Sequence, residues 1–300
     1  MQNFHELPLL RDSLSYHYVE YVIVEKVKKG IVTLSEKGRV HIPTADLSVL
    51  LLGPGTSISS AAVTLLARTG CLVVWVGQDG TRFYASGTGE TRQARRVLHQ
   101  AMLVSHYKLR QQVVLNMYHA RFDDILPRTL SLPQIRGKEG ARMRTAYAEA
   151  SKKYGVAWNG RRYNRGKWGD SDSINRALSS ANSLLNDLCH TAIVSGGYSP
   201  ALGFIHTGKQ RSFVFDIADL YKVELTIPIA FEIIAESEQD ISKRVRALCR
   251  ERFREAKLLG RILPDIDRLL YVPDEHMPTI EPGDIDEDGA LPTELWKPLN

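Results

Sequence analysis

The sequence predicts an α+β protein of two domains, in which a hinge joins a small, mostly β N-terminal domain to a larger all-α C-terminal domain. Two patterns along the 300 residues lead to this prediction. Over residues 1–85, runs of β-branched and aromatic residues are separated by glycine turns, whereas over 92–272 apolar residues recur at helical spacing. Residues 86–91 (Ser-Gly-Thr-Gly-Glu-Thr) form the hinge, and the length itself favours two domains.

The N-terminal domain contains one predicted helix among its strands. The helix runs from Ser59 to Thr69 and is ended by Gly70. Gly53-Pro-Gly55 ahead of it is interpreted as a turn, because no Gly-Lys-Ser/Thr completes a phosphate loop. The predicted strands cover residues 18–24, 31–34, 40–42, 49–52, 72–76 and 81–84.

The larger domain is predicted to be almost entirely helical. Helices are expected over a stretch that ends near Phe122 and over residues 138–154, 172–195, 215–234 and 240–271, the last with room for a break. Residues 273–300 are acidic, rich in proline and poor in residues that could pack. We expect this tail to be disordered or to be ordered only by a partner.

The formal net charge of +5 conceals an uneven distribution. Residues 82–168 carry 18 basic and 5 acidic side chains, whereas residues 273–300 carry 1 and 8. The positive charges of such a block repel one another unless a polyanion neutralises them. Proteins usually carry a basic block of this kind to bind nucleic-acid phosphates, which releases counterions. The pattern favours nucleic-acid contact over a set of solvated helix faces. Aromatic residues interleave with the charges at Tyr147, Tyr154, Trp158, Tyr163 and Trp168.

Several classes of protein lose support. No apolar stretch reaches the roughly 18 residues needed to cross a bilayer, and Met1–Glu6 lacks the pattern of a signal peptide. Cys71, Cys189 and Cys249 are far apart among apolar residues, which predicts buried thiols in a reducing compartment. Neither His-Glu-x-x-His nor Gly-x-Ser-x-Gly occurs, which argues against zinc proteolysis and serine hydrolysis. We expect a cytoplasmic protein without a membrane partner.

Glu139 is the first candidate site residue. It is a single carboxylate among the basic residues Arg136, Lys138, Arg142 and Arg144. It could be an ion-pair partner, part of a helix start, or a metal ligand placed where basic side chains hold a phosphate backbone. The residues alone leave these alternatives open.

His206, Asp216 and Asp219 form the second candidate group. His206 lies at a loop edge, and the two aspartates are three residues apart, so on a helix they would share an otherwise apolar face. Two like charges there are costly unless a cation joins them. Carboxylates favour Mg²⁺ or Mn²⁺, and histidine is tolerated best by Mn²⁺. A capping Asp and a structural His explain the same spacing equally well.

Five segments form an ordered set between about residue 8 and residue 270. With these segments the chain resembles the CRISPR-associated integrases of spacer acquisition, and most closely their type I-E subfamily. No single motif is decisive, but their order and separations make the set specific. The segments are Gly53-Pro-Gly-Thr56 with the following helix, Leu72–Gly77, Arg136-Gly-x-Glu-Gly140, Trp158–Tyr163, and Gly203–Lys209 with Phe215–Asp219.

The resemblance implies a catalytic set of one Glu, one His and two Asp, which falls on Glu139, His206, Asp216 and Asp219. Glu139, His206 and Asp219 would hold Mg²⁺ or Mn²⁺, with Asp216 beside them. The family's fold, a β domain, a hinge and a helical catalytic domain, agrees with the one predicted above. Close relatives can show a tyrosine near position 186, where this chain has Asn186. This difference favours metal-activated hydroxyl attack over a tyrosine nucleophile.

The resemblance also implies particular contacts with double-stranded DNA. Arg82, Arg136, Lys209 and Arg246 match phosphate-contacting residues. Tyr21 matches an aromatic that wedges the end of the duplex, in an alignment that needs a one-residue gap.

The activity that the resemblance implies is strand transfer in CRISPR adaptation, an antiviral defence. The 3′-hydroxyl of a short captured duplex attacks a phosphodiester of the CRISPR repeat. Family members form homodimers through the N-terminal domain, and two such dimers flank a dimer of a small companion protein in a hetero-hexamer. Two alternatives stay open: a metal-dependent nuclease acting on branched DNA in repair, and a non-catalytic DNA-binding subunit.

Overall fold

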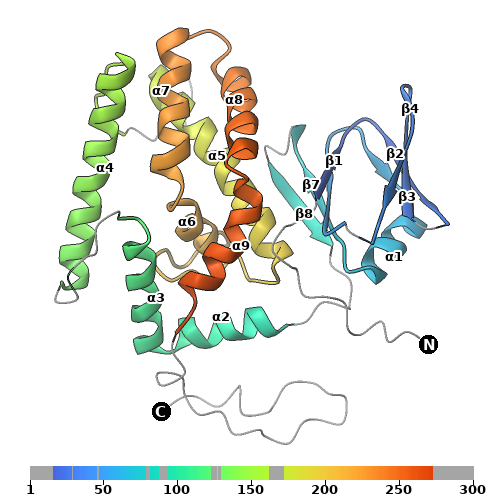
Figure 1. Cartoon of the computed structure of the whole chain (residues 1–300), viewed down its shortest axis with the longest axis horizontal. Coiled ribbons are helices and arrows are strands. Elements are labelled where there is room, and N and C mark those ends of the chain that lie inside the picture. Colours follow the sequence, from blue (N-terminus) through green and yellow to red (C-terminus); the bar gives the residue numbers. More distant parts are fainter. Residues whose placement is uncertain are drawn as a thin grey trace, which may run out of the picture.

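The computed structural model describes residues 16–272, except 29, 46, 79–81, 88–93, 123–126, 128–129 and 162–171. The strands gather on one side of this part of the chain and the helices, apart from one short helix among the strands, on the other (Figure 1), as the α+β prediction requires. No helix within it is long and apolar enough to span a membrane. The predicted tail and most of the predicted hinge lie outside the described residues, whereas Ser86 and Gly87 belong to strand β8.

The strand-rich region consists of two four-stranded sheets. In the first, β1, β5 and β7 are parallel and β8 is antiparallel to β7. The second has the order β4–β3–β2–β6. Helix α1 (Ser60–Arg68) begins where the Ser59 hydroxyl accepts the Ala62 N–H and so caps the helix. The strands are β1 (Tyr16–Val19), β2 (Ile23–Val27), β3 (Gly30–Ser35), β4 (Gly38–Pro43), β5 (Val49–Leu52), β6 (Ser57–Ile58), β7 (Leu72–Val76) and β8 (Phe83–Gly87).

The predicted strand over residues 18–24 is wrong, because the chain turns inside it. β1 ends at Val19, β2 begins at Ile23, and Tyr21 between them has a left-handed φ of 53°. β1 pairs with β5 in the first sheet and β2 pairs with β3 in the second. The turn at Tyr21 therefore carries the chain from one sheet to the other.

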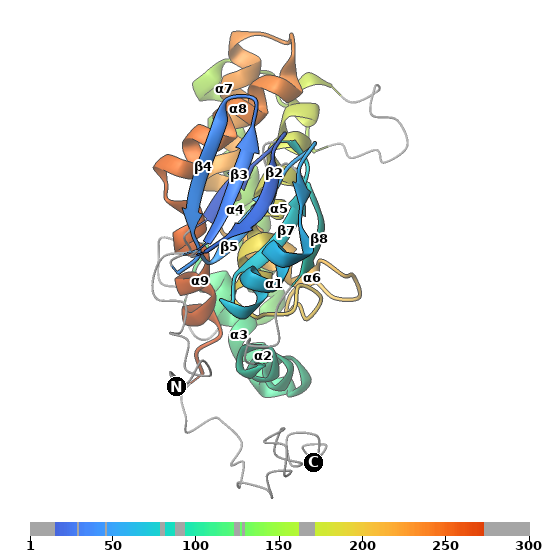
Figure 2. The ribbon, with the colours of Figure 1, turned by 90° about the vertical axis from the view of Figure 1, so that its right-hand side faces the viewer.

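Strand β5 of the first sheet is buried on both faces, and its alternating side chains belong to two different cores. On β5, Val49 and Leu51 belong to the core of the helical region, whereas Leu50 and Leu52 belong to a core shared with α1 and the second sheet. Burial on both faces explains why β5 is a continuous apolar run. Figure 2 shows the sheets lying across one side of the helices.

The helical region is arranged around α5, which contacts α6, α7, α8 and α9 (Figure 1). The predicted helix over 215–234 is divided into α6, a π-helix (η3) and α7, and the one over 240–271 breaks at Lys257, whose φ is 48°. All three cysteines are buried, as predicted. The helices are α2 (Arg95–Ser105), α3 (Tyr107–His119), α4 (Leu132–Tyr154), α5 (Ser173–Ser195), α6 (Ser212–Ala218), η3 (Lys222–Thr226), α7 (Ile227–Glu236), α8 (Ile241–Glu255) and α9 (Leu258–Leu269).

Candidate active site

Asp216 lies on α6 and is completely buried. Its carboxylate accepts the backbone N–H groups of Phe204 at 2.6 Å, Ile205 at 3.1 Å and His206 at 2.9 Å. The Nδ1 atom of His206 lies 2.7 Å from the same carboxylate. These four contacts fold the loop before α6 around Asp216, so this carboxylate faces the loop.

The loop before α6 presents the His206 side chain, which is 44% exposed. With Nδ1 hydrogen-bonded to Asp216, the tautomer with a proton on Nδ1 is favoured, and Nε2 remains for a ligand. Gly203 permits the tight turn, because a Cβ there would lie 2.2 Å from the His206 carbonyl oxygen.

Glu139 and Asp219 meet at a buried arginine that sequence reasoning had not singled out. The Nη1 atom of Arg121 is 3.7 Å from Glu139 Oε1 and 3.7 Å from Asp219 Oδ2. Glu139 also accepts a hydrogen bond from Arg142 Nε at 3.1 Å, and Asp219 is paired with Lys222. Glu139 comes from the first half of α4 and Asp219 from the end of α6. The fold thus brings these two predicted ligands onto one cation.

The three predicted metal ligands are not all brought together. Within the described ranges, no group of three or more His, Cys, Asp or Glu side chains is close enough to hold a metal ion, so His206 stays apart from Glu139 and Asp219. The donor chemistry fits Mg²⁺ or Mn²⁺, because two carboxylates converge on one positive group and the imidazole tautomer is fixed by a carboxylate.

The comparisons with curated proteins decide the family. The chain is 49% identical over 98% of its length to "CRISPR-associated endonuclease Cas1 2" of Thermus thermophilus, of which it covers 90%. It is 42% identical over 92% of its length to "CRISPR-associated endonuclease Cas1" of Geobacter sulfurreducens, of which it covers 91%. The chain belongs to the Cas1 family. The family model described as "CRISPR associated protein Cas1" matches residues 118–245, a range that includes Arg121 and all four predicted catalytic residues.

A solved structure of a Cas1 protein agrees with this assignment. The chain in "Crystal structure of TtCas1-DNA complex" is 50% identical, with a TM-score of 0.81 over 88% of this chain and 99% of that one. "Casposase bound to integration product" matches with a TM-score of 0.52 at 12% identity, over 80% of this chain and 86% of that one, which shows a shared fold alone.

The predicted DNA contacts of this Cas1 chain lie on four separate elements. Arg136 is exposed on α4, less than one turn before Glu139. Lys209 is exposed after the His206 loop, Arg82 is exposed beside β8, and Arg246 is half-buried on α8. Arg136 and Lys209 are therefore accessible on the elements that carry Glu139 and His206, as phosphate contacts near the candidate site would be.

Tyr21 is 67% exposed, and the turn predicted at Gly53–Gly55 is confirmed beside it. The Tyr21 N–H donates to the Pro54 carbonyl at 2.9 Å. A Cβ on Gly55, whose φ is 66°, would lie 2.5 Å from the Tyr21 ring. The turn supports the base of an exposed aromatic ring, which is the geometry a wedge against a duplex end requires.

Two aromatics of the basic block have a structural role. Tyr147 stacks on Trp158 with ring centroids 4.4 Å apart, and Trp158 packs against Phe231 at 5.8 Å. These rings fasten α4 to α7 and so position Glu139. Tyr163 and Trp168 lie outside the described residues.

A second arginine–carboxylate contact, also missed from the sequence, lies between the helical region and β8. Asp187 on α5 is buried and accepts a hydrogen bond from Arg211 Nη2 at 2.6 Å. Burial raises the pKa of Asp187 to about 6, although Arg211 opposes this shift. His190, one turn later, stacks on Phe83 of β8 at 3.7 Å, and burial lowers its pKa to about 4. In the sequence, this contact could have been suspected from an Asp and a His that lie on the otherwise apolar face of a predicted helix.

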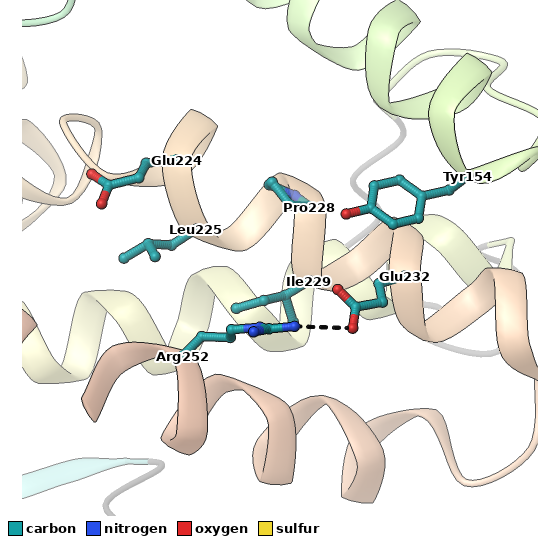
Figure 3. Close-up of a pocket in the computed structure, with 7 residues that line it drawn as sticks. All are labelled: Tyr154, Glu224, Leu225, Pro228, Ile229, Glu232 and Arg252. Atoms are coloured by element: carbon teal, nitrogen blue, oxygen red, sulfur yellow. Dashed lines mark hydrogen bonds and ion pairs between the residues drawn. The ribbon is translucent and has the colours of Figure 1, made fainter. Parts of the chain in front are cut away.

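A cavity of about 180 Å³ opens where α4, α7 and α8 meet (Figure 3). Its floor is formed by apolar side chains such as Ile229, and its Glu232 is paired with Arg252 at 3.3 Å. It includes none of the predicted catalytic residues, so it is separate from the candidate active site.

Proposed function

We propose that this Cas1-family chain is a metal-dependent DNA endonuclease and integrase of CRISPR adaptation, of the type I-E subfamily. It inserts short DNA fragments as new spacers through attack of a fragment's 3′-hydroxyl on repeat phosphodiesters. Its curated relatives are named CRISPR-associated endonucleases, and a chain 50% identical to it forms a complex with DNA. The ordered segments of the sequence support the subfamily.

The observation that carries the proposal is the convergence of Glu139 and Asp219 on one cation, on the same helix–loop framework that holds His206 against the buried Asp216. Glu139, Asp219 and His206 Nε2 would hold the ion. When bound, Mg²⁺ or Mn²⁺ supplies Lewis acidity, which lowers the pKa of an attacking hydroxyl and offsets charge on the phosphoryl oxygens.

The chain's own residues position the reactants. Asp216 holds the His206 ring and its tautomer in place from the buried side. Arg136 and Lys209, both exposed beside the site, would contact the phosphate backbone without reading its sequence. Arg82 and Arg246 would extend this contact, and Tyr21 would stack on the end of the captured duplex.

We also propose that the chain forms homodimers through its strand-rich region, with a small companion protein between two such dimers. Exposed apolar side chains on that region support a protein interface. They are Tyr16, Ile23, Val40 and Tyr84. A structure that shares this fold is described as a Cas1–Cas2 complex, which agrees with a companion of this kind.

The test is a joining assay with purified protein, companion protein, a labelled duplex with free 3′-hydroxyl ends and a repeat-bearing plasmid, in Mg²⁺ or Mn²⁺. Asp219→Ala should lower the joining rate by about 100-fold or more, because a ligand is lost, while DNA affinity stays nearly unchanged. Glu251→Gln, an exposed carboxylate of α8, is the control and should join normally.

The outcomes separate the proposal from its alternatives. Cleavage without joining would indicate a nuclease acting on branched DNA. Metal-independent DNA binding that neither Asp219→Ala nor Glu139→Gln alters, with no joining, would indicate a non-catalytic DNA-binding subunit.

A further inference from the structure

Arg121 is a buried arginine just beyond the C-terminal end of α3, and its side chain is 4% exposed. Nη1 faces Glu139 and Asp219 at the same distance, 3.7 Å. Nη2 donates to the Asp216 carbonyl at 3.3 Å, and the guanidinium lies 5.3 Å from the Tyr118 ring centroid. One cation thus touches three of the four predicted catalytic residues.

The two carboxylate contacts of Arg121 are electrostatic rather than well-formed hydrogen bonds. A charge-assisted N–H···O bond is normally about 2.7–2.9 Å long, which is shorter than either of its carboxylate contacts. Its Nε atom is buried and has no hydrogen-bond partner among the described residues. A buried donor left unsatisfied is costly, so the arrangement neutralises charge without fixing the guanidinium by geometry.

We infer that Arg121 occupies the position of the divalent cation in the metal-free protein and competes with that cation for Glu139 and Asp219. This inference rests on the metal site proposed above. Two carboxylates that face one another in a partly buried site repel each other unless a positive charge lies between them. Glu139 and Asp219 are only 13% and 19% exposed, so solvent screens them incompletely.

The chemistry of arginine makes it a suitable placeholder. Its guanidinium cannot lose its proton at physiological pH, so it stays positive whether or not a metal is near. A divalent ion entering between the carboxylates meets a like charge, and either displaces Arg121 or binds against its repulsion. Arg121 is in this sense a positioning residue, which keeps the carboxylates converged and makes metal binding weaker.

The experiment measures Mn²⁺ binding by calorimetry and thermal unfolding with and without Mn²⁺. Arg121→Gln should bind Mn²⁺ about tenfold more tightly than the parent, because the competing charge is gone. It should unfold at a lower temperature in EDTA, and Mn²⁺ should raise its unfolding temperature by more than it raises that of the parent.

Arg96→Gln is a matched control. Arg96 also pairs with a carboxylate (Asp267, 2.9 Å), donates to a backbone carbonyl (Gly196, 3.3 Å) and lies over a tyrosine ring (Tyr198, 5.4 Å), but it contacts none of the predicted catalytic residues. It should lower stability in EDTA without changing the affinity for Mn²⁺.

Glu139→Gln distinguishes failure of the metal site from failure of the inference. If Glu139→Gln binds Mn²⁺ as the parent does, the proposed site is wrong and the inference is wrong with it. If Glu139→Gln weakens binding but Arg121→Gln leaves the affinity at the parent value, the inference alone is overturned.

If Arg121→Gln does not fold in EDTA, the parent protein decides the question. The Nε–H of Arg121 is buried, so we expect slow exchange with solvent and a ¹⁵N resonance that can be followed during Mg²⁺ titration and assigned with Arg121→Lys. A shift that saturates together with Mg²⁺ binding supports displacement. An unchanged resonance at full Mg²⁺ occupancy overturns it.

Discussion

Helices α4 and α5 are each 23 residues long, yet they are used in opposite ways. Fourteen residues of α5 are buried, whereas α4 buries only Ile135 and Ala150. In Figure 1, α5 runs through the middle of the helices and α4 lies at their edge. Asp187 lies on α5 and Glu139 lies on α4.

The difference indicates which carboxylate supports the fold and which one is available for the proposed chemistry. The buried carboxylate of Asp187 accepts a direct 2.6 Å hydrogen bond from Arg211, near the point where β8 packs against the helices. Glu139 is held at 3.7 Å by Arg121, on a helix fastened mainly by a few side chains. Changes on α5 should therefore lower stability, and changes on α4 should lower activity.

The largest effect on stability is expected for Asp187→Ala. Removing this carboxylate leaves Arg211 without its partner in a mostly buried place, which should lower the free energy of unfolding by about 1–3 kcal/mol. Urea denaturation measures it. A loss below about 0.5 kcal/mol would contradict the role assigned to α5.

Asp187→Asn is the matched variant for this prediction. Because burial raises the pKa of Asp187 to about 6, the fold favours its neutral form, and this contribution is full below about pH 4 and is lost as the pH rises through 6. The neutral amide should therefore cost less than alanine.

A smaller effect is expected for Glu139→Gln on α4. The side chain keeps its shape, and its amide oxygen can still accept a hydrogen bond from Arg142, so the free energy of unfolding should change by less than about 1 kcal/mol. The same variant should lose strand transfer in the joining assay. A cost in stability as large as that of Asp187→Ala would remove the distinction between the two helices.

The smallest effect is expected on the pH dependence of the free energy of unfolding, and it involves His190 on α5. Burial lowers the pKa of His190 to about 4 from an ordinary 6.5, so its contribution to stability is full above about pH 6.5 and is lost as the pH falls toward 4. His190→Phe keeps an aromatic stack on Phe83 but cannot take up a proton. Its free energy of unfolding should therefore fall less on acidification from pH 7 to 5, by roughly 1 kcal/mol or less. Parallel profiles in urea denaturation would contradict this.

Local patterns predicted most of the fold, because strand alternation and helical spacing are set by neighbouring residues. The error at residues 18–24 arose where a distant segment intervenes: Tyr21 sits in an unbroken β pattern, but the Pro54 carbonyl and Gly55 hold it in a left-handed turn. The sequence of residues 18–24 taken by itself does not reveal this long-range contact.

The candidate site shows the same limit more strongly. Resemblance pointed to Glu139, His206, Asp216 and Asp219, and spacing alone left a structural explanation equally open. Arg121 was missed because it is one arginine among many in the basic block, and only the packing of α3 against α4 and α6 gives it two carboxylate neighbours.

The candidate site also has an order of appearance during synthesis. Arg121 and Glu139 leave the ribosome well before Asp216 and Asp219, and the loop with His206 cannot close until Asp216 follows it. A growing chain can therefore complete its sheets and α4 without possessing a site for DNA chemistry. A chain interrupted before α6 would lack Asp216 and Asp219, and so could not assemble the proposed site.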